Sequence, residues 1–342
     1  MEFMNVFDFF ASPIGLGHVT RDIAIANYFQ NNSINFITGS GAAKILKNLD
    51  FSVLDKYNPP SFVIKNGTLQ NSTKWLWNYY KYYKECKDIS KKILHIDDPN
   101  LVISDEDFAS LTVAQEMKIP TVLITDVLET KFTKGITSII EKKMNKSMQE
   151  IIKKCDVVII PEDGKNQDNI KRVGPIVRQI NESREKLREK FSFTQKTILI
   201  SVGGTDAGLF LIEESLKAIS TINQDIETIL VSGPAISKKF ENVRNMGFVN
   251  NLHELIFASD VVISMAGKST IDEANAYGTP SIFIPIKGHF EQEDNASRQG
   301  FVFEDIKRLK ELILEKMEQK RYQNDTNGAR DAAEIIKKLI TE

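Results

Sequence analysis

Short apolar runs alternate with longer amphipathic segments along this chain, and the alternation limits the folds open to it. Strands separated by helices over short connections are typical of a parallel sheet covered by helices on both faces. The alternation is broken at residues 173–176, which include Gly174 and Pro175, and restarts at residue 197. We therefore predict an α/β protein with two Rossmann-like domains joined by a linker near Gly174.

The expected elements fall into two series. The first series of strands covers residues 5–11, 34–38, 52–54, 101–104, 121–124 and 157–160, and the second covers 197–202, 228–231, 246–249, 261–264 and 281–284. Helices are predicted at 18–30, 42–48, 73–94, 108–117, 136–153, 182–190, 209–221, 252–258, 269–277, 291–299, 306–320 and 328–341. Since 342 residues suit two domains of about 150 residues, we place domains at 1–175 and 176–325, and a terminal helix within 326–342.

Composition excludes several classes of protein. A chain that is 42% hydrophobic and 26% charged is globular, and a net charge of −2 gives no reason to expect nucleic-acid binding. Cys86 and Cys155 lack the spacing of a metal site or a disulfide framework, which predicts two buried thiols in a reducing compartment. No apolar run approaches the roughly 20 residues of a membrane span. We expect a cytoplasmic protein, with any membrane contact peripheral on the inner face.

The strand predicted at 261–264 is followed by a turn of small residues and a helix. Ala266 and Gly267 allow close backbone approach to a ligand, and Ser269 or Thr270 can cap the helix. Free N–H groups and the helix dipole favour an anion at such a helix start. Glu273 lies one turn into the helix, near enough to accept hydrogen bonds from sugar hydroxyls.

Polar residues also follow the strand predicted at 281–284, namely Glu291, Gln292 and Asn295. The carboxyl ends of strands are where open α/β sheets bind ligands. A Gly203-Gly204-Thr205 turn after the strand at 197–202 repeats the arrangement, although tight turns need glycine too. Together these loops predict a phosphate site in the second domain.

These motifs resemble a known family. The pattern S-x-x-G-x-x-T-x-x-E-x-x-x-x-G-x-P from Ser264, with E-Q-x-x-N-A from Glu291, resembles the nucleotide-sugar half of GT-B glycosyltransferases. It is most similar to relatives of the N-acetylglucosaminyltransferase that acts on the lipid-linked peptidoglycan precursor. The segment G-L-G-H-V-T-R at residues 15–21 resembles the opening motif of a related group of bacterial and archaeal transferases.

The resemblance implies two facing Rossmann-like domains, the first for the acceptor and the second for a UDP-sugar, with the terminal helix crossing back to the first. It implies a donor site made from Gly203, Gly204, Thr205, Phe248, Val249, Ala266, Gly267, Lys268, Ser269, Thr270, Glu273, Glu291, Gln292 and Asn295. Within it, backbone at Phe248 and Val249 reads the nucleobase, Glu273 binds the ribose, and Gln292 and Asn295 bind the sugar. N-acetylglucosamine is the sugar that the resemblance favours, but the family often has two amides where this chain has Glu291-Gln292, so glucose, galactose or a related hexosamine stay open.

His18 is the candidate catalytic residue. The lone His at a helix start could cap the helix, lie in the core or act in catalysis, and the resemblance favours a general base that deprotonates the acceptor hydroxyl. Gly15 and Gly17 would let the acceptor approach the backbone. Arg21, one turn on, suits either a surface ion pair or an acceptor phosphate. His253 is expected to be a surface or structural residue, and His289 either lines the cleft or belongs to a plain loop.

Asp105-Glu106-Asp107 spells the D-x-D spacing with which another glycosyltransferase fold holds a divalent metal. The triplet lies away from the donor loops, so we expect no metal and no other cofactor. Helix dipoles and backbone amides would then neutralise the leaving diphosphate. Asp105 at a strand end would line the acceptor cleft.

The helix predicted at 73–94 carries six aromatic residues, more than one core-facing stripe requires. Trp75, Tyr79, Tyr82 and Tyr83 suit the core, which leaves Trp77 and Tyr80 beside lysines. Exposed aromatics with lysines suit a membrane interface or a lipid-linked acceptor, whereas a packed helix with solvated lysines is the alternative.

The sequence thus favours an inverting, metal-independent transfer of a hexosyl or N-acetylhexosaminyl group from a UDP-sugar to a lipid or lipid-linked acceptor. Two alternatives remain open at this point. A UDP-sugar 2-epimerase or hydrolase of the same fold would consume donor without an acceptor. A non-catalytic nucleotide-sugar-binding component of a complex would have no turnover.

Overall fold

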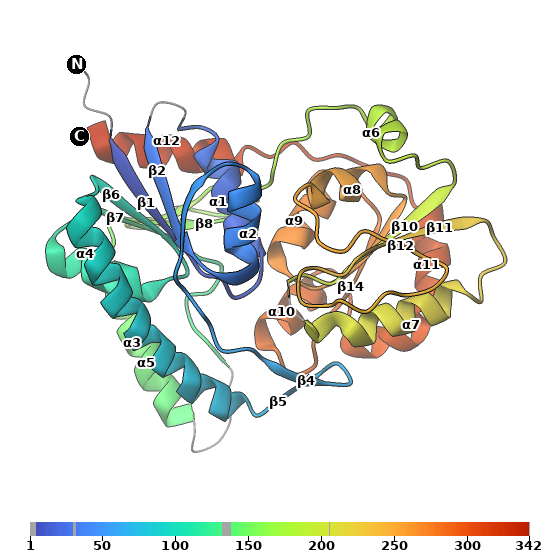
Figure 1. Ribbon diagram of the computed structural model, residues 1–342, viewed down its shortest axis with the longest axis horizontal. Coiled ribbons are helices and arrows are strands. Elements are labelled where there is room, and N and C mark those ends of the chain that lie inside the picture. The colour runs from blue at the N-terminus through green and yellow to red at the C-terminus, as the bar shows by residue number, and fades with distance from the viewer. Residues whose placement is uncertain (1–4, 30–31, 132–137, 205, 342) are drawn as a thin grey trace. The chain divides into compact units, whose positions relative to one another are not determined.

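The computed structural model of the chain describes residues 5–29, 32–131, 138–204 and 206–341. It divides into two compact units (Figure 1). The first unit comprises residues 1–61, 71–177 and 326–342, and the second comprises 62–70 and 178–325. The chain passes from the first unit to the second after residue 177 and returns after residue 325. The sequence predicted these two boundaries after residues 175 and 325. The sequence gives no sign that residues 62–70 pack with the second half of the chain.

The first unit contains a parallel sheet with the strand order β3-β2-β1-β6-β7-β8-β9. Its strands are β1 Val6–Ala11, β2 Ser33–Thr38, β3 Ser52–Asp55, β6 Leu101–Asp105, β7 Thr121–Ile124, β8 Val157–Ile160 and β9 Ile170–Arg172. The strand order reverses between β1 and β6, so the loops that follow these two strands diverge there. Such a switch point is where open parallel sheets bind ligands.

Helices cover both faces of this sheet (Figure 1). They are α1 Gly17–Ala26, α2 Ser40–Asn48, α3 Ser72–Asp97, α4 Phe108–Met117, α5 Ser138–Lys154 and α12 Gly328–Thr341. On one face, Phe10 packs with buried residues of α3 and α4. Phe7 points to the other face, where its ring meets Phe29 at 5.4 Å, and Lys337 of α12 lies over Phe29. The terminal helix therefore packs on the first unit, beside α1.

The second unit repeats the plan with the strand order β12-β11-β10-β13-β14, again all parallel. Its strands are β10 Lys196–Ser201, β11 Ile226–Val231, β12 Arg244–Asn245, β13 Val261–Met265 and β14 Ser281–Ile284. Its helices are α6 Arg184–Lys190, α7 Leu209–Ile219, α8 Leu252–Ala258, α9 Lys268–Ala276, α10 Phe290–Arg298 and α11 Leu309–Glu318. The switch point of this sheet lies between β10 and β13.

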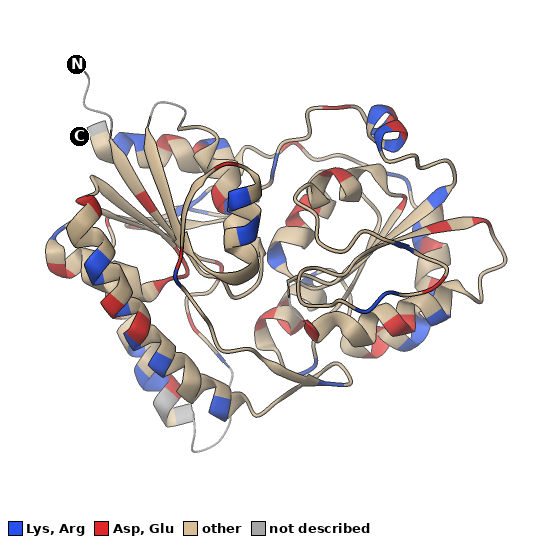
Figure 2. Ribbon diagram, in the orientation of Figure 1, with Lys and Arg blue, Asp and Glu red and all other residues tan. Residues whose placement is uncertain are grey.

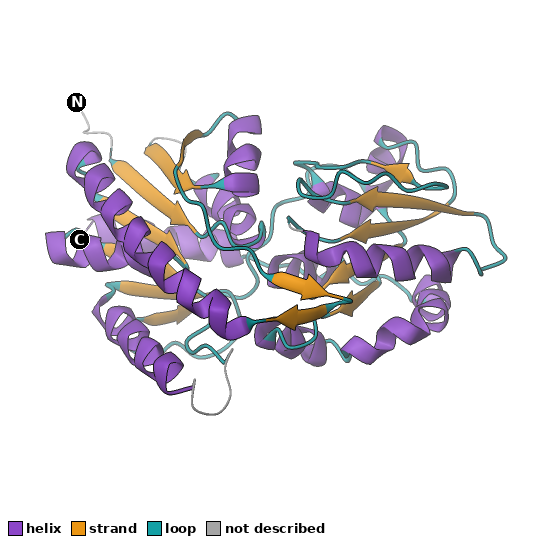
Figure 3. Cartoon of the chain, turned by 60° about the horizontal axis from the view of Figure 1, so that its bottom comes forward, coloured by secondary structure: helices purple, strands orange, loops and turns teal. Residues whose placement is uncertain are grey.

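A small antiparallel hairpin, β4 Val63–Lys65 with β5 Thr68–Gln70, stands apart from both sheets and leads directly into α3 (Figure 3). Asn66 and Gly67 form its turn, both with positive φ (47° and 72°). That pair of angles is typical of the type I′ turn that Asn-Gly favours. The Asn-Gly pair between short apolar runs was a usable signal, but the sequence prediction missed this hairpin and β9.

Three predicted elements are wrong in their extent. The strand predicted at 246–249 lies just before that range, at Arg244–Asn245, because the positive φ of Gly247 (64°) ends the extended chain. The helix predicted at 18–30 ends at Ala26, where Tyr28 and Phe29 donate instead to carbonyls three residues earlier. The helix predicted at 306–320 is shortened because residues Phe303–Arg308 form a 3₁₀ segment.

Cys86 and Cys155 are free and buried, as predicted. Burial raises the pKa of both thiols, that of Cys155 to about 12. Both are therefore protonated and unreactive near neutral pH. Among the described helices, none combines the length and the apolar character that crossing a membrane would require.

Candidate active site

His18 and Asp105 meet at the switch point of the first sheet. His18 lies at the start of α1, directly after the loop from β1, and Asp105 ends β6. The register of the sheet sets Ala11 beside Asp105, so the loop after β1 begins at the aspartate. His18 Nδ1 lies 2.7 Å from Asp105 Oδ1. With Asp105 as the acceptor, Nδ1 carries its proton and Nε2 is the nitrogen left for chemistry.

Asp105 controls the charge of His18. Burial by itself lowers the pKa of His18, but the charges of Asp105 and Glu106 and the bond to Asp105 outweigh it and raise the pKa to about 9. Burial alone would raise the pKa of Asp105, whereas Arg21 and His18 lower it well below its usual range. Asp105 therefore stays ionised and stabilises an imidazolium at His18.

Arg21 positions Asp105 and is itself buried. Its Nε donates to Asp105 Oδ2 at 2.5 Å, its Nη2 to Asp105 Oδ1 at 2.6 Å, and its Nη1 to Asp126 Oδ1 at 2.6 Å. Its side chain is 3% exposed. Of the two predicted roles, this geometry shows the ion pair, which is buried and not at the surface.

Asp22 is a buried carboxyl beside this cluster that the sequence did not single out. In the part of the chain that the structure describes, neither of its carboxyl oxygens has a hydrogen-bond partner. Burial and the charge of Asp105 raise its pKa well above the usual range, so the group is neutral. An acidic residue within the apolar helical stretch of α1 was the available signal.

Glu106 faces the free side of His18. Its Oε2 lies 3.8 Å from His18 Nε2, while Oε1 accepts hydrogen bonds from Thr125 Oγ1 and Asp126 N, each at 3.1 Å. Its backbone has φ of 55°, a region that costs a side-chain-bearing residue energy and that persists at functional sites. His18 Nε2, the nitrogen left for chemistry, therefore lies near the carboxylate of Glu106, while the other ring nitrogen contacts Asp105.

The Asp105-Glu106-Asp107 triplet does not present its aspartates to a common ligand. Asp105 pairs with Arg21 and His18, and Asp107 caps α4 by accepting from Ala109 N and Ser110 N. Asp107 also accepts from Tyr57 Oη at 2.8 Å. Across the described ranges, no cluster of three or more His, Cys, Asp or Glu is arranged to hold a metal ion.

The expected acceptor loop has room above it. Gly15 has φ of 90°, and a Cβ built on it would meet no atom within 4 Å. Gly17 is the first residue of α1, which has no side-chain cap at its N-terminus. The first turn of α1 thus presents backbone N–H groups at an open loop.

In the second unit, the register of the sheet gathers the predicted donor loops. Ser201 at the end of β10 lies beside Ser264, and Ser264 lies beside Phe283 of β14. The glycines that follow β10 and β13 leave space: a Cβ at Gly203 (φ 79°) would approach only Met265, at 3.8 Å, and one at Gly267 would meet nothing within 4 Å. Gly204 follows in the same loop, and Thr205 lies outside the described residues.

The helix start that was predicted to bind an anion is α9. Gly267 is its N-cap, and no side chain caps it, so the prediction that Ser269 or Thr270 caps the helix is wrong; both lie in its first turn. Ala266 precedes the helix and is buried. Lys268 places Nζ at 2.6 and 2.5 Å from the two carboxylate oxygens of Asp272, so its charge is paired within the helix.

Glu273 is held by Arg178, a residue that the sequence did not single out. Arg178 Nε donates to Glu273 Oε1 at 2.7 Å, and Nη2 donates to Oε2 at 3.1 Å. Arg178 Nη1 also donates to the carbonyl of Asn250 at 3.0 Å. One guanidinium thus ties the expected ribose ligand to the loop expected to read the base. An arginine after the apolar Ile176-Val177 pair was the only signal.

The expected sugar residues gather at α10. Gln292 Oε1 accepts from Ile286 N at 3.0 Å, and Asn295 Nδ2 donates to the carbonyl of Ala266 at 3.3 Å. Glu291 lies in the first turn. His289 caps the helix through Nδ1, and burial lowers its pKa to about 4, so it is a neutral structural group.

Phe248 and Val249 follow β12 and are half-buried. Gly247, just before them, has φ of 64° with open space at its α-carbon. The carbonyl of Gly247 accepts from Gly233 N at 3.1 Å, which links this loop to the one after β11. His253 in α8 has a buried Nδ1, and burial together with the charges of Arg178 and Lys190 lowers its pKa to about 3, as suits the structural role predicted for it.

The aromatic helix α3 divides as predicted. Trp75 is buried, and Tyr79, Tyr82 and Tyr83 are half-buried, whereas Trp77 and Tyr80 are 58% and 40% exposed. Lys81 Nζ lies 5.9 Å from the Trp77 ring and Lys84 Nζ lies 4.6 Å from the Tyr80 ring. Both basic and acidic residues line the helix (Figure 2).

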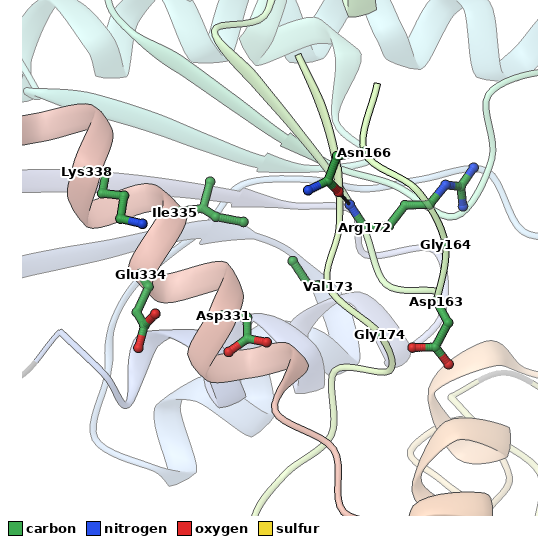
Figure 4. A pocket seen from close by; sticks show the side chains of 10 residues that line it. All are labelled: Asp163, Gly164, Asn166, Arg172, Val173, Gly174, Asp331, Glu334, Ile335 and Lys338. Carbon is green, nitrogen blue, oxygen red and sulfur yellow. Dashed lines mark hydrogen bonds between the residues drawn. The ribbon is translucent and has the colours of Figure 1, made fainter. Parts of the chain in front are cut away.

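A separate open cavity of about 380 Å³ lies in the first unit, where the segment after β8 faces α12 (Figure 4). Asp163, Asp331 and Glu334 line it together with Arg172 and Lys338, so charges of both signs are present. No candidate site residue lines it, although Gly174 of the expected linker does. It carries no sign of a particular ligand.

Comparison with known proteins finds glycosyltransferases. An uncharacterized glycosyltransferase of Methanosarcina mazei is 26% identical over 364 residues, which cover 94% of this chain and 93% of the relative. The UDP-N-acetylglucosamine--N-acetylmuramyl-(pentapeptide) pyrophosphoryl-undecaprenol N-acetylglucosamine transferase of Aquifex aeolicus is 32% identical over 123 residues, 33% of this chain and 36% of the relative. A processive diacylglycerol beta-glucosyltransferase of Bacillus licheniformis is 28% identical over 150 residues, 40% and 38% of the two chains.

Solved structures share the fold along the whole chain. The glycotransferase of kitacinnamycin matches with a TM-score of 0.64 and 10% identity, over 98% of this chain and 99% of that one. MurG of Acinetobacter baumannii matches with a TM-score of 0.55 and 16% identity, over 98% and 99%. The protein is a glycosyltransferase with the GT-B fold, as the sequence motifs predicted. Residues 197–339 match the glycosyltransferase family 28 C-terminal domain, and the chain is similar to the MurG group of transferases.

Proposed function

We propose that this glycosyltransferase moves a hexosyl or N-acetylhexosaminyl group from a UDP-sugar to a hydroxyl of a lipid or lipid-linked acceptor, with inversion and without a metal. The observation that carries the reaction is the His18–Asp105 pair at the switch point of the first sheet. The first unit takes the acceptor in this proposal, and the second takes the donor. The names of the Aquifex and Bacillus relatives, which act on a pyrophosphoryl-undecaprenol and a diacylglycerol, support the acceptor class.

The proposed chemistry is a single displacement. His18 Nε2 takes the proton of the acceptor hydroxyl while the hydroxyl oxygen forms a bond to the anomeric carbon of the donor sugar. At the same time the bond from that carbon to the diphosphate breaks, and its electron pair leaves with UDP. Asp105 stabilises the imidazolium that results. Glu106 beside Nε2 makes an uncharged hydroxyl group, and not a phosphate, the suitable neighbour of the base.

The donor assignment rests on the three loops that the second sheet gathers. The uncapped start of α9 and the open space at Gly203 and Gly267 support a diphosphate there, where the helix dipole would stabilise its charge without a metal. Glu273 is assigned to the ribose, Phe248 and Val249 to uracil, and Gln292 and Asn295 to the sugar. Thr205 remains a proposed donor residue on the sequence motif alone.

Peripheral membrane contact is the final part of the proposal. Trp77 and Tyr80 are exposed aromatic side chains with lysine ammonium groups over their rings. Amphipathic aromatics and long basic side chains partition to the boundary between lipid headgroups and acyl chains. A lipid acceptor would be met at such a boundary.

The test is turnover of UDP-sugars in the presence of lipid acceptors, with His18→Ala as the variant. We expect a loss of about 10²–10⁴-fold in kcat, with UDP binding unchanged, and no effect of a metal chelator. His95→Ala, an exposed histidine of α3, is the matched control and should keep full activity. A product with retained anomeric configuration would contradict inversion, and donor consumption that needs no acceptor would indicate an epimerase or a hydrolase.

A further inference from the structure

The β4–β5 hairpin, residues 62–70, belongs to the second unit although the chain on both sides of it belongs to the first. Its turn at Asn66 and Gly67 needs two positive φ values, 47° and 72°. Two-residue turns of this type fix the register of a hairpin rigidly. The first half of the chain therefore supplies a preformed element to the second unit.

The hairpin binds the segment that connects β14 to α10. Leu69 N donates to the carbonyl of Lys287 at 2.8 Å, and Lys287 N donates to the carbonyl of Gly67 at 2.8 Å. Thr68 pairs with Lys287 as a parallel bridge. The hairpin thus extends its backbone pairing to the loop at the carboxyl end of β14.

Aromatic rings fix the hairpin on its other side. A Cβ at Gly67 would come within 2.7 Å of the Phe303 ring and 2.8 Å of the Phe210 ring, so the turn is packed directly against them. The Phe62 ring meets the His289 ring edge-on, at 5.1 Å between centroids. His289 is the N-cap of α10.

From the loop that the hairpin binds, contacts continue into the sugar-binding end of α10. Ile286 N donates to Gln292 Oε1 at 3.0 Å, and Gly288 N donates to Glu293 Oε1 at 2.8 Å. These bonds hold the first turn of α10 against residues 286–289. The position of the Gln292 amide therefore depends on a loop that is paired with the hairpin.

We propose that the hairpin at residues 62–70 positions the sugar subsite, and so sets the affinity for the sugar of the donor and not for its nucleotide. This rests on the proposed function, in which Gln292 contacts the sugar. The backbone bonds of the hairpin reach the β14–α10 loop, whereas the nucleotide and diphosphate are assigned to the loops after β10, β12 and β13. The residues of the hairpin are positioning residues, since none is required to touch the substrate.

The experiment measures, by calorimetry, the affinities of UDP and of whichever of UDP-N-acetylglucosamine, UDP-glucose and UDP-galactose the full chain binds most tightly. Gly67→Ala forces a Cβ into the Phe210 and Phe303 rings at a positive φ. Gly300→Ala is the matched control, because Gly300 has a similar φ of 81° but open space at its α-carbon. Phe62→Leu is a milder variant that removes the ring contact with His289.

We expect Gly67→Ala to weaken the UDP-sugar by about 10-fold or more, with UDP within 2-fold of the parent, and Phe62→Leu to do the same to a smaller degree. Gly300→Ala should leave the ratio of the two affinities unchanged. If UDP and the UDP-sugar weaken together, or if neither weakens in a variant that folds, the hairpin does not position the sugar subsite. If the parent protein binds neither UDP nor a UDP-sugar, it is the proposed function that fails.

Discussion

Arg178 and Glu273 form a buried two-bond ion pair, with Nε to Oε1 at 2.7 Å and Nη2 to Oε2 at 3.1 Å. Their side chains are 8% and 5% exposed. Because the same guanidinium also holds the carbonyl of Asn250, one residue next to the linker organises both the proposed ribose ligand and the loop after β12. Loss of either partner would leave a buried charge without a counterion.

We expect Arg178→Ala to lower the free energy of unfolding by about 3–5 kcal/mol, the usual effect of removing one partner of a buried pair. Arg178→Lys keeps the charge but loses the second bond, so its free energy of unfolding should lie between those of the parent and of Arg178→Ala. Thermal and urea unfolding measure both. Lys287→Ala, which breaks an exposed pair with Glu304, is the control and should cost at most about 1 kcal/mol. A similar small effect at both sites would show that the Arg178 pair is not structural.

The pH dependence of kcat/KM should follow His18. Its pKa is raised to about 9, so the neutral form that can accept a proton is a minority at pH 7 and increases up to pH 9. We therefore expect kcat/KM to rise with pH and to level off near pH 9. Asp105→Asn removes the charge that raises this pKa and should move the rise toward the ordinary value of about 6.5. A profile that is level from pH 6 to 9 would exclude His18 as the base.

The free energy of unfolding should depend on pH through the titration of Asp22. Its folded pKa is raised, so the folded state binds this proton more tightly than the unfolded state does. The free energy of unfolding therefore begins to fall as pH rises above the unfolded pKa of about 3.9, and it continues to fall until the folded pKa is reached. Asp22→Asn keeps the shape and removes the titration.

The prediction for Asp22→Asn is a difference in slope. Between pH 4 and pH 7 the free energy of unfolding of the variant should increase relative to that of the parent, measured by urea unfolding at each pH. A constant difference across this range would mean that Asp22 is ionised in the folded protein. Asp225→Asn, in a loop of the second unit, is an exposed control.

Trp77 and Tyr80 should matter for lipid binding and not for folding. The double variant Trp77→Ala with Tyr80→Ala removes exposed rings, so its unfolding should change by less than about 1 kcal/mol. Binding to vesicles that contain anionic lipid, measured by sedimentation, should weaken several-fold. Trp75→Ala provides the contrast, because that ring is buried and its indole N–H bonds to the carbonyl of Pro60 at 3.0 Å. Equal vesicle binding by the double variant and the parent would leave α3 without a membrane role.

The sequence predicts the two sheets well because their strands are continuous apolar runs. Thr121–Ile124, Val157–Ile160 and Ser281–Ile284 lie where their patterns place them, since a strand buried on both faces needs apolar residues throughout. The helix at Phe108–Met117 is predicted equally well, because Asp107 caps its N-terminus. The edge strand β12 has only two residues, and each strand of the hairpin has only three, so neither carries a long apolar run.

The site is predictable only where a motif marks it. Motifs mark His18 in the first turn of α1, Gly203 and Gly267 after β10 and β13, and Gln292 in the first turn of α10. The register of the second sheet explains why the loops after β10, β13 and β14 lie side by side. Arg178, Asp22 and Glu106 belong to no motif that predicts their roles, because those roles arise from burial and from neighbours distant in the sequence, such as Glu273 for Arg178. Arg21 illustrates the reverse: its place one turn after His18 is clear from the sequence, but its burial between Asp105 and Asp126 is not.

The chain passes between the two units four times, after residues 61, 70, 177 and 325. A gene fragment that encodes residues 178–325 would therefore not encode the whole second unit, because the strands at 63–70 would be missing from it. Recombination at the linker, in nature or in the laboratory, would graft β14 and α10 onto a foreign hairpin. Donor specificity in this chain is thus inherited from two separate stretches of the gene, and chimeras that exchange it must carry both.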